Sequence, residues 1–146
     1  MVKSIAIVGG SSDIAKSTIS SMSADNYKFH VLVRDDSHTD ELSASGVSVV
    51  LGDATSGEDI KNFISGVKES GEIHAILHCV GSFAVRPPHA MNKEAFETVI
   101  STNLTSAFLT LSIAGKAMLS QGHGRMVFMS SVAGSLGLVN HEAISA

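Results

Sequence analysis

Short apolar runs alternate with segments of helical periodicity along almost the whole chain. Most residues of each run are apolar, as expected for parallel strands that are covered on both faces. The five runs are residues 3–8, 28–33, 47–51, 73–80 and 125–130. Because helical segments separate them, the pattern predicts an α/β fold with a doubly wound parallel sheet, an αβα arrangement of three layers. Ligands of such sheets bind at the carboxyl ends of the strands.

Two of the predicted helices follow the first and third runs. The first covers residues 14–24 and is expected to bury Ile14, Ile19 and Met22. The second has the clearest helical period in the chain, with four apolar residues at i, i+3, i+4 and i+7. These four residues are Ile60, Phe63, Ile64 and Val67.

A long helical region is predicted over residues 92–120. Its apolar residues form one stripe at helical spacing. The stripe consists of Phe96, Val99, Ile100, Leu104, Ala107, Phe108 and Leu111. Polar residues interrupt the most apolar part, so we expect a buried helix and no membrane span. Asn103 falls inside the stripe, and a buried asparagine needs partners for its amide. It is therefore either a satisfied core residue or part of a site.

The last predicted elements lie at the end of the sequence. Residues 131–134 are expected to form a loop, and residues 141–146 the start of a further helix. The fifth strand is apolar throughout, and as the last strand it would be an exposed edge prone to association. We therefore expect residues 1–146 to be one domain that is truncated on its C-terminal side. The alternative is a short protein whose edge strand is covered by another chain.

Composition narrows the possible functions. The chain has 146 residues, 44% of them hydrophobic, which suits one domain with a sizeable core. A formal net charge of −4 without a basic run argues against nucleic acid or an anionic membrane surface as a partner. A single cysteine, Cys79, fits a cytoplasmic location. His74 and His78 would lie about 13 Å apart on a strand, too far to share a metal ion, so we expect no metal site.

A glycine- and serine-rich turn joins the first strand to the first helix. It reads Gly9-Gly10-Ser11-Ser12-Asp13 and leads into Ile14. In this place a pyrophosphate can bind to free N–H groups of the helix N-terminus and to serine hydroxyls. An ordinary strand-to-helix turn is the alternative. A carboxylate at Asp13 would repel a phosphate unless it turned away.

Arg34 ends the second strand, where the ribose of a dinucleotide would lie. Its guanidinium can bind a 2′-phosphate, which favours NADP. The preceding position, where an NAD site would carry an acid, is Val33. In the alternative, Arg34 is a solvated residue that pairs with Asp35 or Asp36. Those two acids also leave NAD possible.

Four motifs in chain order resemble the short-chain dehydrogenase/reductase family. The turn from Gly9 to Ala15 is similar to the family's Gly-xxx-Gly-x-Gly cofactor turn, with Asp13 and Ala15 at the later glycines. His78-Cys-Val-Gly81 stands where the family has Asn-Asn-Ala-Gly. Asn103 and Ser131 match the family's active-site asparagine and catalytic serine. The resemblance covers the whole chain but only the N-terminal part of the family's Rossmann-like fold.

The resemblance implies an NAD(P)-dependent oxidoreductase that transfers hydride between the nicotinamide and a carbonyl or alcohol substrate. NADP is the expected cofactor, with NAD as the alternative. Asn103 and Ser131 would be catalytic, and association through the long helix would give a homo-oligomer. The implied cofactor-binding residues are Gly9, Ser11, Ser12, Asp13, Ile14, Arg34, Asp53, Ala54, Cys79, Val80 and Gly81. For Asp53 a simple turn cap is an equally open interpretation.

The sequence departs from the family at the proton donor. The family's tyrosine lies thirteen residues after its serine, and Ile144 occupies that position here. The family's lysine would fall two places beyond Ala146. The alternatives to an oxidoreductase are therefore a catalytically inactive dinucleotide-binding protein and a non-functional fragment.

Overall fold

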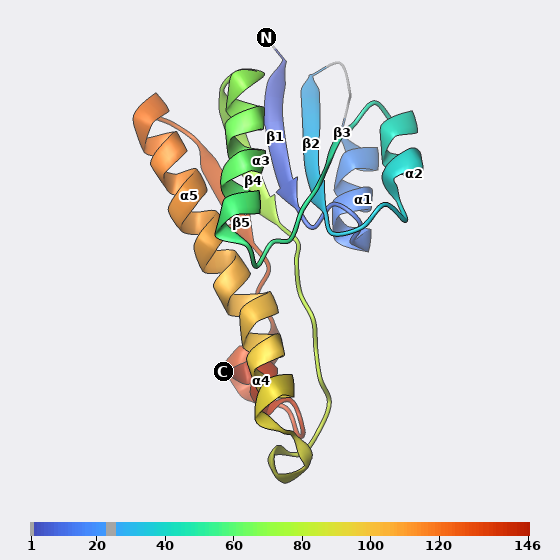
Figure 1. Cartoon of the computed structure of the whole chain (residues 1–146), viewed down its shortest axis with the longest axis vertical. Helices are drawn as coiled ribbons and strands as arrows, with labels where there is room; N and C mark the ends of the chain where they lie inside the picture. The colour runs from blue at the N-terminus through green and yellow to red at the C-terminus, as the bar shows by residue number, and fades with distance from the viewer. Residues whose placement is uncertain (1, 23–25) are drawn as a thin grey trace.

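The computed structural model describes residues 2–22 and 26–146. Its centre is a parallel sheet of five strands in the order β3-β2-β1-β4-β5 (Figure 1). The strands are β1 (Lys3–Val8), β2 (Tyr27–Val33), β3 (Ser48–Leu51), β4 (Ile73–His78) and β5 (Arg125–Phe128). The predicted doubly wound parallel sheet is thus confirmed. The five apolar runs differ from the observed strands only at their ends.

Helices cover both faces of the sheet. On one face, α1 (Asp13–Ser21) and α2 (Thr39–Ala44) enclose a cluster that includes Ile7, Val31 and Leu42. On the other, α3 (Gly57–Glu69) and α5 (Ser106–Gln121) pack over β1 and β4 (Figure 1). The four apolar residues predicted for α3 are all buried in this second cluster. Two separate cores, one on each face, therefore hold the carboxyl ends of the strands in a fixed plane.

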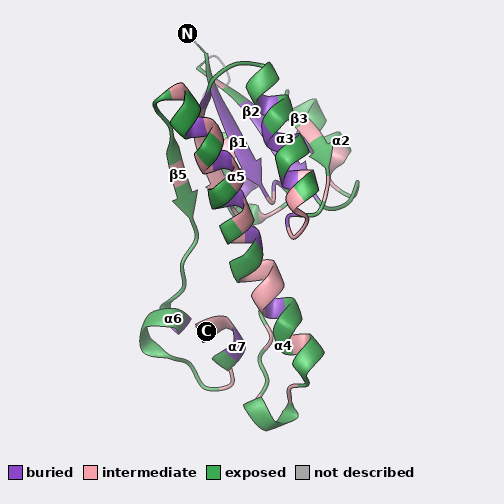
Figure 2. Ribbon diagram, turned by 60° about the vertical axis from the view of Figure 1, so that its left-hand side comes forward, coloured by how far each residue is buried: buried purple, intermediate pink, exposed green. Residues whose placement is uncertain are grey.

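The remaining elements extend beyond that end of the sheet. They are a 3-10 turn η1 (Pro88–Ala90), the helix α4 (Lys93–Ile100), the π-helical turn η2 (Ser101–Thr105), and the short helices α6 (Val132–Leu136) and α7 (Glu142–Ser145). Figure 2 shows α4 continuing through the π turn into α5, with α6 and α7 below β5. The residues expected to form a loop at 131–134 instead start α6, because the Ser131 hydroxyl accepts a hydrogen bond from the Ala133 N–H and caps the helix.

The apolar stripe predicted for the long helix is confirmed at Val99, which is buried, and is wrong where it continues into α5. The buried face of α5 consists of Ser106, Thr110, Ala114 and Met118, whereas Leu104, Phe108 and Leu111 are exposed (Figure 2). The π turn adds a residue to the helical repeat, which rotates all later side chains relative to α4. Small side chains then face the sheet and let the helix approach it. By length and composition, Lys93–Gln121 could cross a membrane, and only 22% of its most apolar window is buried.

The first predicted helix is correct in place but differs in its buried face. It begins at Asp13, and Ala15 is its buried residue, while Ile14 is 52% exposed. Ile19 and Met22 are partly buried against the core, as expected. The predicted extension of this helix to Ala24 falls partly outside the described residues.

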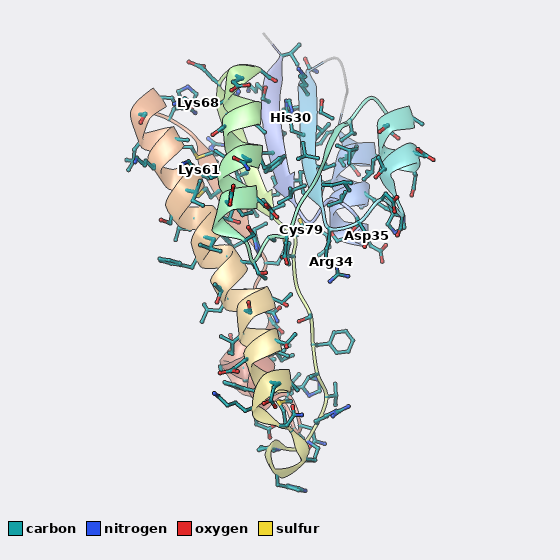
Figure 3. The ribbon with its side chains drawn as sticks, viewed as in Figure 1. His30, Arg34, Asp35, Lys61, Lys68 and Cys79 are labelled. Carbon is teal, nitrogen blue, oxygen red and sulfur yellow. The ribbon has the colours of Figure 1, made fainter. Side chains whose placement is uncertain are left out.

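Buried His30 makes the stability of the fold depend on pH. It lies in β2 opposite Ala6 and Ser48, is 5% exposed, and its Nε2 has no partner among the residues that the structure describes (Figure 3). Burial, assisted by the charge of Lys28, lowers its pKa below the ordinary 6.5. The unfolded chain therefore takes up a proton at a pH where the folded chain does not.

We expect the free energy of unfolding to fall as the pH drops from above 6.5 through the lowered pKa, because protonation then favours the unfolded state. Urea unfolding followed between pH 7.5 and 5 measures this slope. His30→Leu removes this titrating group and should reduce the dependence of the unfolding free energy on pH. Burial also lowers the pKa of His78, so this residue should account for the dependence that remains. An unchanged slope in His30→Leu would show that His30 does not titrate with unfolding.

Candidate functional site

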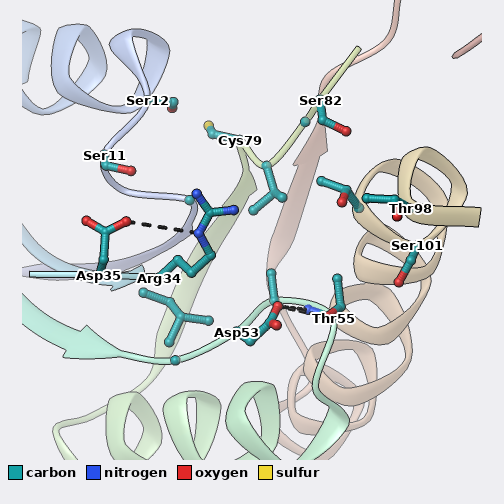
Figure 4. Close-up of a pocket in the computed structure, with 17 residues that line it drawn as sticks. Ser11, Ser12, Arg34, Asp35, Asp53, Thr55, Cys79, Ser82, Thr98 and Ser101 are labelled. Atoms are coloured by element: carbon teal, nitrogen blue, oxygen red, sulfur yellow. Dashed lines mark hydrogen bonds and ion pairs between the residues drawn. The ribbon is translucent and has the colours of Figure 1, made fainter. Parts of the chain in front are cut away.

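A cavity of about 650 Å³ lies at the carboxyl ends of the strands. Figure 4 shows it between the turn after β1, the ends of β2 and β3, the segment after β4, and the helix formed by α4 and η2. The residues that line it are Gly9, Ser11, Ser12, Leu32, Arg34, Asp35, Gly52, Asp53, Ala54, Thr55, Cys79, Val80, Gly81, Ser82, Thr98, Ser101 and Thr102. Nine of the eleven cofactor-binding residues predicted from the sequence are in this set.

The turn after β1 is held against the sheet by its glycines. The N–H groups of Gly9 and Gly10 both donate to the Leu32 carbonyl at 3.0 Å, so they are not free for a ligand. Gly9 has φ of +89°, and a Cβ there would lie 2.9 Å from the backbone of Cys79 and Val80. Glycine is therefore required for the turn to approach the end of β4 this closely.

An anion in the cavity would meet the start of α1. The Ser12 hydroxyl accepts a hydrogen bond from the Ala15 N–H at 3.2 Å and caps the helix. The hydroxyls of Ser11 and Ser12 line the cavity, but the side chains of Asp13 and Ile14 do not. Asp13 is the exposed first residue of α1, and its carboxylate is not part of the cavity wall. Asp13 and Ile14, which the sequence predicts to bind the cofactor, are thus not among the residues that line this cavity, and their role stays a prediction.

Two charged residues of opposite sign follow β2. Arg34 Nε lies 4.0 Å from Asp35 Oδ2, and the Arg34 side chain is 84% exposed, so it is free to reorient toward a ligand (Figure 4). Hydrogen bonds from the Ser37 hydroxyl and N–H hold the pKa of Asp35 below its usual value. Asp35 is therefore ionised at neutral pH. The structure is therefore compatible with both alternatives for Arg34. The residue lies beside Asp35, and it also lines the cavity in which a phosphate could bind.

Asp53 closes the cavity at the end of β3. Its Oδ1 accepts hydrogen bonds from the Thr55 N–H and hydroxyl, both at 2.8 Å, and these lower its pKa. Its own N–H donates to Asp59 Oδ2 at 2.8 Å. Asp53 thus caps a turn and presents its second carboxylate oxygen to the cavity region. The two interpretations left open for this residue are compatible.

The segment after β4 forms the opposite wall. Cys79 N–H donates to the Val8 carbonyl at 2.8 Å, which continues the sheet by one bond. Burial raises the pKa of the Cys79 thiol, and a weaker hydrogen bond to Ser12 opposes this. The thiol is therefore protonated at neutral pH. Val80, Gly81 and Ser82 continue this wall toward the helix.

Asn103 holds this wall in place. Its Nδ2 donates to the carbonyls of Ser82 and Val99, both at 2.9 Å, and its Oδ1 accepts from the Ser82 N–H at 3.0 Å. The predicted active-site asparagine therefore lies behind the cavity wall. Ser131 lies at the cap of α6, and no hydrogen bond joins it to Asn103 within the described part of the chain. The two predicted catalytic residues thus have separate hydrogen-bond partners in this structure, and their catalytic roles stay predictions.

Several cavity-lining residues were missed from the sequence. The polar ones are Thr55, Ser82, Thr98, Ser101 and Thr102. Thr98, Ser101 and Thr102 recur at i, i+3 and i+4 on the long helix, a polar stripe that could have been found by its periodicity. Among the residues that the structure describes, there is no group of three side chains able to hold a metal ion.

The model of the short chain dehydrogenase family matches residues 3–146. Among curated relatives, the 3-oxoacyl-[acyl-carrier-protein] reductase MabA of Mycobacterium tuberculosis is 29% identical over 99% of this chain and 57% of the relative. A tropinone reductase homologue of Arabidopsis thaliana is 27% identical over 92% of this chain and 53% of the relative. The chain therefore spans little more than half the length of these relatives.

Solved structures share the fold. ElxO with NADP bound superposes with a TM-score of 0.90 at 20% identity, covering 99% of this chain and 61% of that one. An actinorhodin polyketide ketoreductase with NADPH gives 0.89 at 24% identity, covering 99% and 59%. An NAD⁺-bound xylitol dehydrogenase gives 0.88 at 25% identity, covering 97% and 58%. Structures with either cofactor thus share this architecture.

Proposed function

The chain belongs to the short-chain dehydrogenase family, and on that premise we propose that it forms the cofactor-binding part of an NADP-dependent oxidoreductase. The bound cofactor would supply or accept a hydride at its nicotinamide, and the substrate would be a small carbonyl compound or alcohol. The observation that carries this proposal is the cavity of about 650 Å³ at four strand ends, bounded by the Gly9 turn and by Cys79 to Gly81.

The side chains of the cavity fit a dinucleotide. The start of α1, with the hydroxyls of Ser11 and Ser12, offers hydrogen-bond donors to a pyrophosphate. Asp53 and the hydroxyl groups of the long helix offer polar contacts at the far end of the cavity. A neutral thiol at Cys79 adds no negative charge next to the phosphates.

Arg34 supports NADP over NAD. Its guanidinium is the cation in the cavity wall, and it can bind a 2′-phosphate with two parallel hydrogen bonds. Asp35 instead favours NAD, because an ionised carboxylate could accept a hydrogen bond from the 2′-hydroxyl of that cofactor. We infer NADP because the exposed Arg34 can leave Asp35, whose carboxylate keeps its bonds to Ser37.

Catalytic roles for Asn103 and Ser131 belong to the same proposal. Asn103 would fix the wall that carries Gly81 and Ser82, and Ser131 would donate a hydrogen bond to the substrate carbonyl. Its hydroxyl accepts from the Ala133 N–H and keeps its own hydrogen for this purpose. Ile144, at the position of the family's tyrosine, has no proton to give, which favours a dinucleotide-binding protein without turnover as the second candidate function.

A fluorescence titration with NADPH, followed by a turnover screen with carbonyl compounds, tests the proposal. We expect saturable binding in the titration. Oxidation of NADPH by a carbonyl compound would establish the oxidoreductase, whereas binding without oxidation would favour the second candidate. General acid catalysis contributes about 10²–10⁴-fold, so turnover without the tyrosine should be slow. Absence of binding at millimolar NADPH would contradict both.

Association between copies and a cytoplasmic location are further parts of the proposal. The exposed residues Leu104, Phe108 and Leu111 give the long helix an apolar outer face that a second copy could cover. Light scattering of the purified chain should then report more than the 15.2 kDa of a monomer. A mass of one chain at high concentration would contradict the homo-oligomer.

A further inference from the structure

A buried hydrogen bond joins the end of β4 to the start of α5. His78 Nε2 lies 2.9 Å from the Ser106 hydroxyl, and the two residues are 3% and 0% exposed. The Ser106 hydroxyl also donates to the Thr102 carbonyl in the π turn. One hydroxyl thus connects a strand, a helix and the turn between α4 and α5.

The chemistry of the hydroxyl determines the state of the imidazole. A serine hydroxyl carries one hydrogen, and here that hydrogen is given to the Thr102 carbonyl. The bond to His78 can then form only if Nε2 carries a hydrogen and donates it. Burial lowers the pKa of His78, against the smaller opposing effect of a backbone hydrogen bond. The neutral ring is thus favoured, and the bond to Ser106 then assigns its hydrogen to Nε2. The ring packs against Phe128 of β5, with centroids 5.7 Å apart.

Both ends of this link continue into the cavity. His78 is followed directly by Cys79, Val80 and Gly81, which form one wall (Figure 4). Thr102 belongs to the wall formed by the long helix, and its neighbour Asn103 makes hydrogen bonds to Ser82. Two links therefore tie the π turn to the end of β4 and the segment after it: the hydrogen bonds of Asn103 to Ser82, and those of the Ser106 hydroxyl to Thr102 and His78.

We propose that His78 is a positioning residue, which through the Ser106 hydroxyl sets the distance between the two cavity walls and thereby the affinity for the nucleotide. The inference rests on the proposed nucleotide site and adds a residue that does not itself line it. Loss of the bond leaves a buried donor or acceptor without a partner, which the structure can relieve only by moving one wall. His78 then acts on the ligand through Ser106 and Thr102.

The test uses variants of the whole chain and NADPH as the probe. His78→Met and Ser106→Ala should each raise the dissociation constant at least about fivefold: the first takes away the donor to the buried Ser106 oxygen, and the second leaves the His78 N–H without a partner. The double variant should be about as weak as either single one, because both changes break the same link. His78→Gln keeps an N–H at a similar reach and should restore affinity to within about twofold of the parent.

Thr110→Val is the matched control. Thr110 lies one turn after Ser106 on the same buried face, and its hydroxyl has no partner within the described residues. This variant changes the packing of α5 on the sheet but leaves the hydrogen bond between His78 and Ser106 intact. Its affinity for NADPH should therefore stay within about twofold of that of the parent. Equal losses in Thr110→Val and Ser106→Ala would overturn the proposal, as would parental affinity in Ser106→Ala.

Two measurements made without nucleotide, one on the parent and one on the variants, separate this inference from the proposed function. The ¹⁵N spectrum of the His78 ring should show a neutral ring with its hydrogen on Nε2; a hydrogen on Nδ1 would overturn the link even if no variant folds. Alkylation of Cys79, the single cysteine, should be faster in Ser106→Ala than in Thr110→Val. If the parent binds no NADPH, the proposed function fails. The spectrum and the alkylation rates then decide by themselves whether the bond between His78 and Ser106 fixes the position of the segment after β4.

Discussion

Gly9→Ala is expected to weaken NADPH binding by more than about tenfold and to lower the free energy of unfolding by about 1–3 kcal/mol. A side chain at φ of +89° is strained, and its Cβ would stand 2.9 Å from the backbone of Cys79 and Val80. The turn after β1 and the wall after β4 would have to separate. Fluorescence titration and urea unfolding measure the two effects.

Gly66→Ala is the control for this variant. Gly66 lies in the middle of α3 with nothing within 4 Å of an added Cβ. Alanine is the better helix former, so this change should stabilise the chain by about 0.4–1 kcal/mol and leave binding unchanged. Gly9→Ala with parental affinity would mean that the turn does not shape the nucleotide site.

Arg34→Ala is expected to weaken NADPH binding by about 10- to 100-fold and to leave NADH binding nearly unchanged. A hydrogen bond to a charged group contributes about 1.5–3 kcal/mol, and only NADPH carries the 2′-phosphate that would form it. The effect should shrink as salt is added, because the Arg34 side chain is largely exposed. Paired titrations of the two nucleotides at two salt concentrations measure it.

Arg125→Ala provides the same change of charge at the other end of the sheet. Arg125 is the exposed first residue of β5, whereas Arg34 follows the carboxyl end of β2. Its loss should leave both affinities at the parental values. If Arg34→Ala instead spared NADPH, and Asp35→Asn weakened NADH, the site would be an NAD site and the inference of NADP would be wrong.

The fold could be predicted because its signals are local. Each strand is a run of apolar residues, and Ile60 to Val67 repeat at helical spacing, so the alternation of elements is visible without tertiary information. Residues at strand ends, such as Gly9, Arg34 and Asp53, could be assigned to a site for the same reason. Parallel strands bring their carboxyl ends to one edge wherever the helices lie.

The errors arise where tertiary structure changes a local pattern. A π turn at residues 101–105 rotates α5, so Ser106 and Thr110 are buried and Leu104 and Phe108 are not. Periodicity computed through residue 103 cannot detect an extra residue in the repeat. The sequence predicts a loop at Ser131 because the helix that this residue caps has only five residues, too few to show a helical period.

The cavity wall contributed by the long helix illustrates the same limit. The spacing of Thr98, Ser101 and Thr102 marks a polar stripe but not what the stripe faces, and these residues join the site because α4 and the π turn cross the end of the sheet (Figure 4). Likewise, Asp13 and Ile14 follow the motif in sequence but are not among the residues that line the cavity.

Alkylation of Cys79 with and without NADPH tests the central claim most directly. Cys79 is the single cysteine, is half-buried, and lines the cavity between the Gly9 turn and Gly81, so its reaction with iodoacetamide reports on that place alone. Saturating NADPH should slow the reaction by at least about tenfold, since a bound dinucleotide buries most of the wall that it contacts. An alkylation rate that stays the same while NADPH is demonstrably bound would mean that the nucleotide binds elsewhere and that the cavity is not its site.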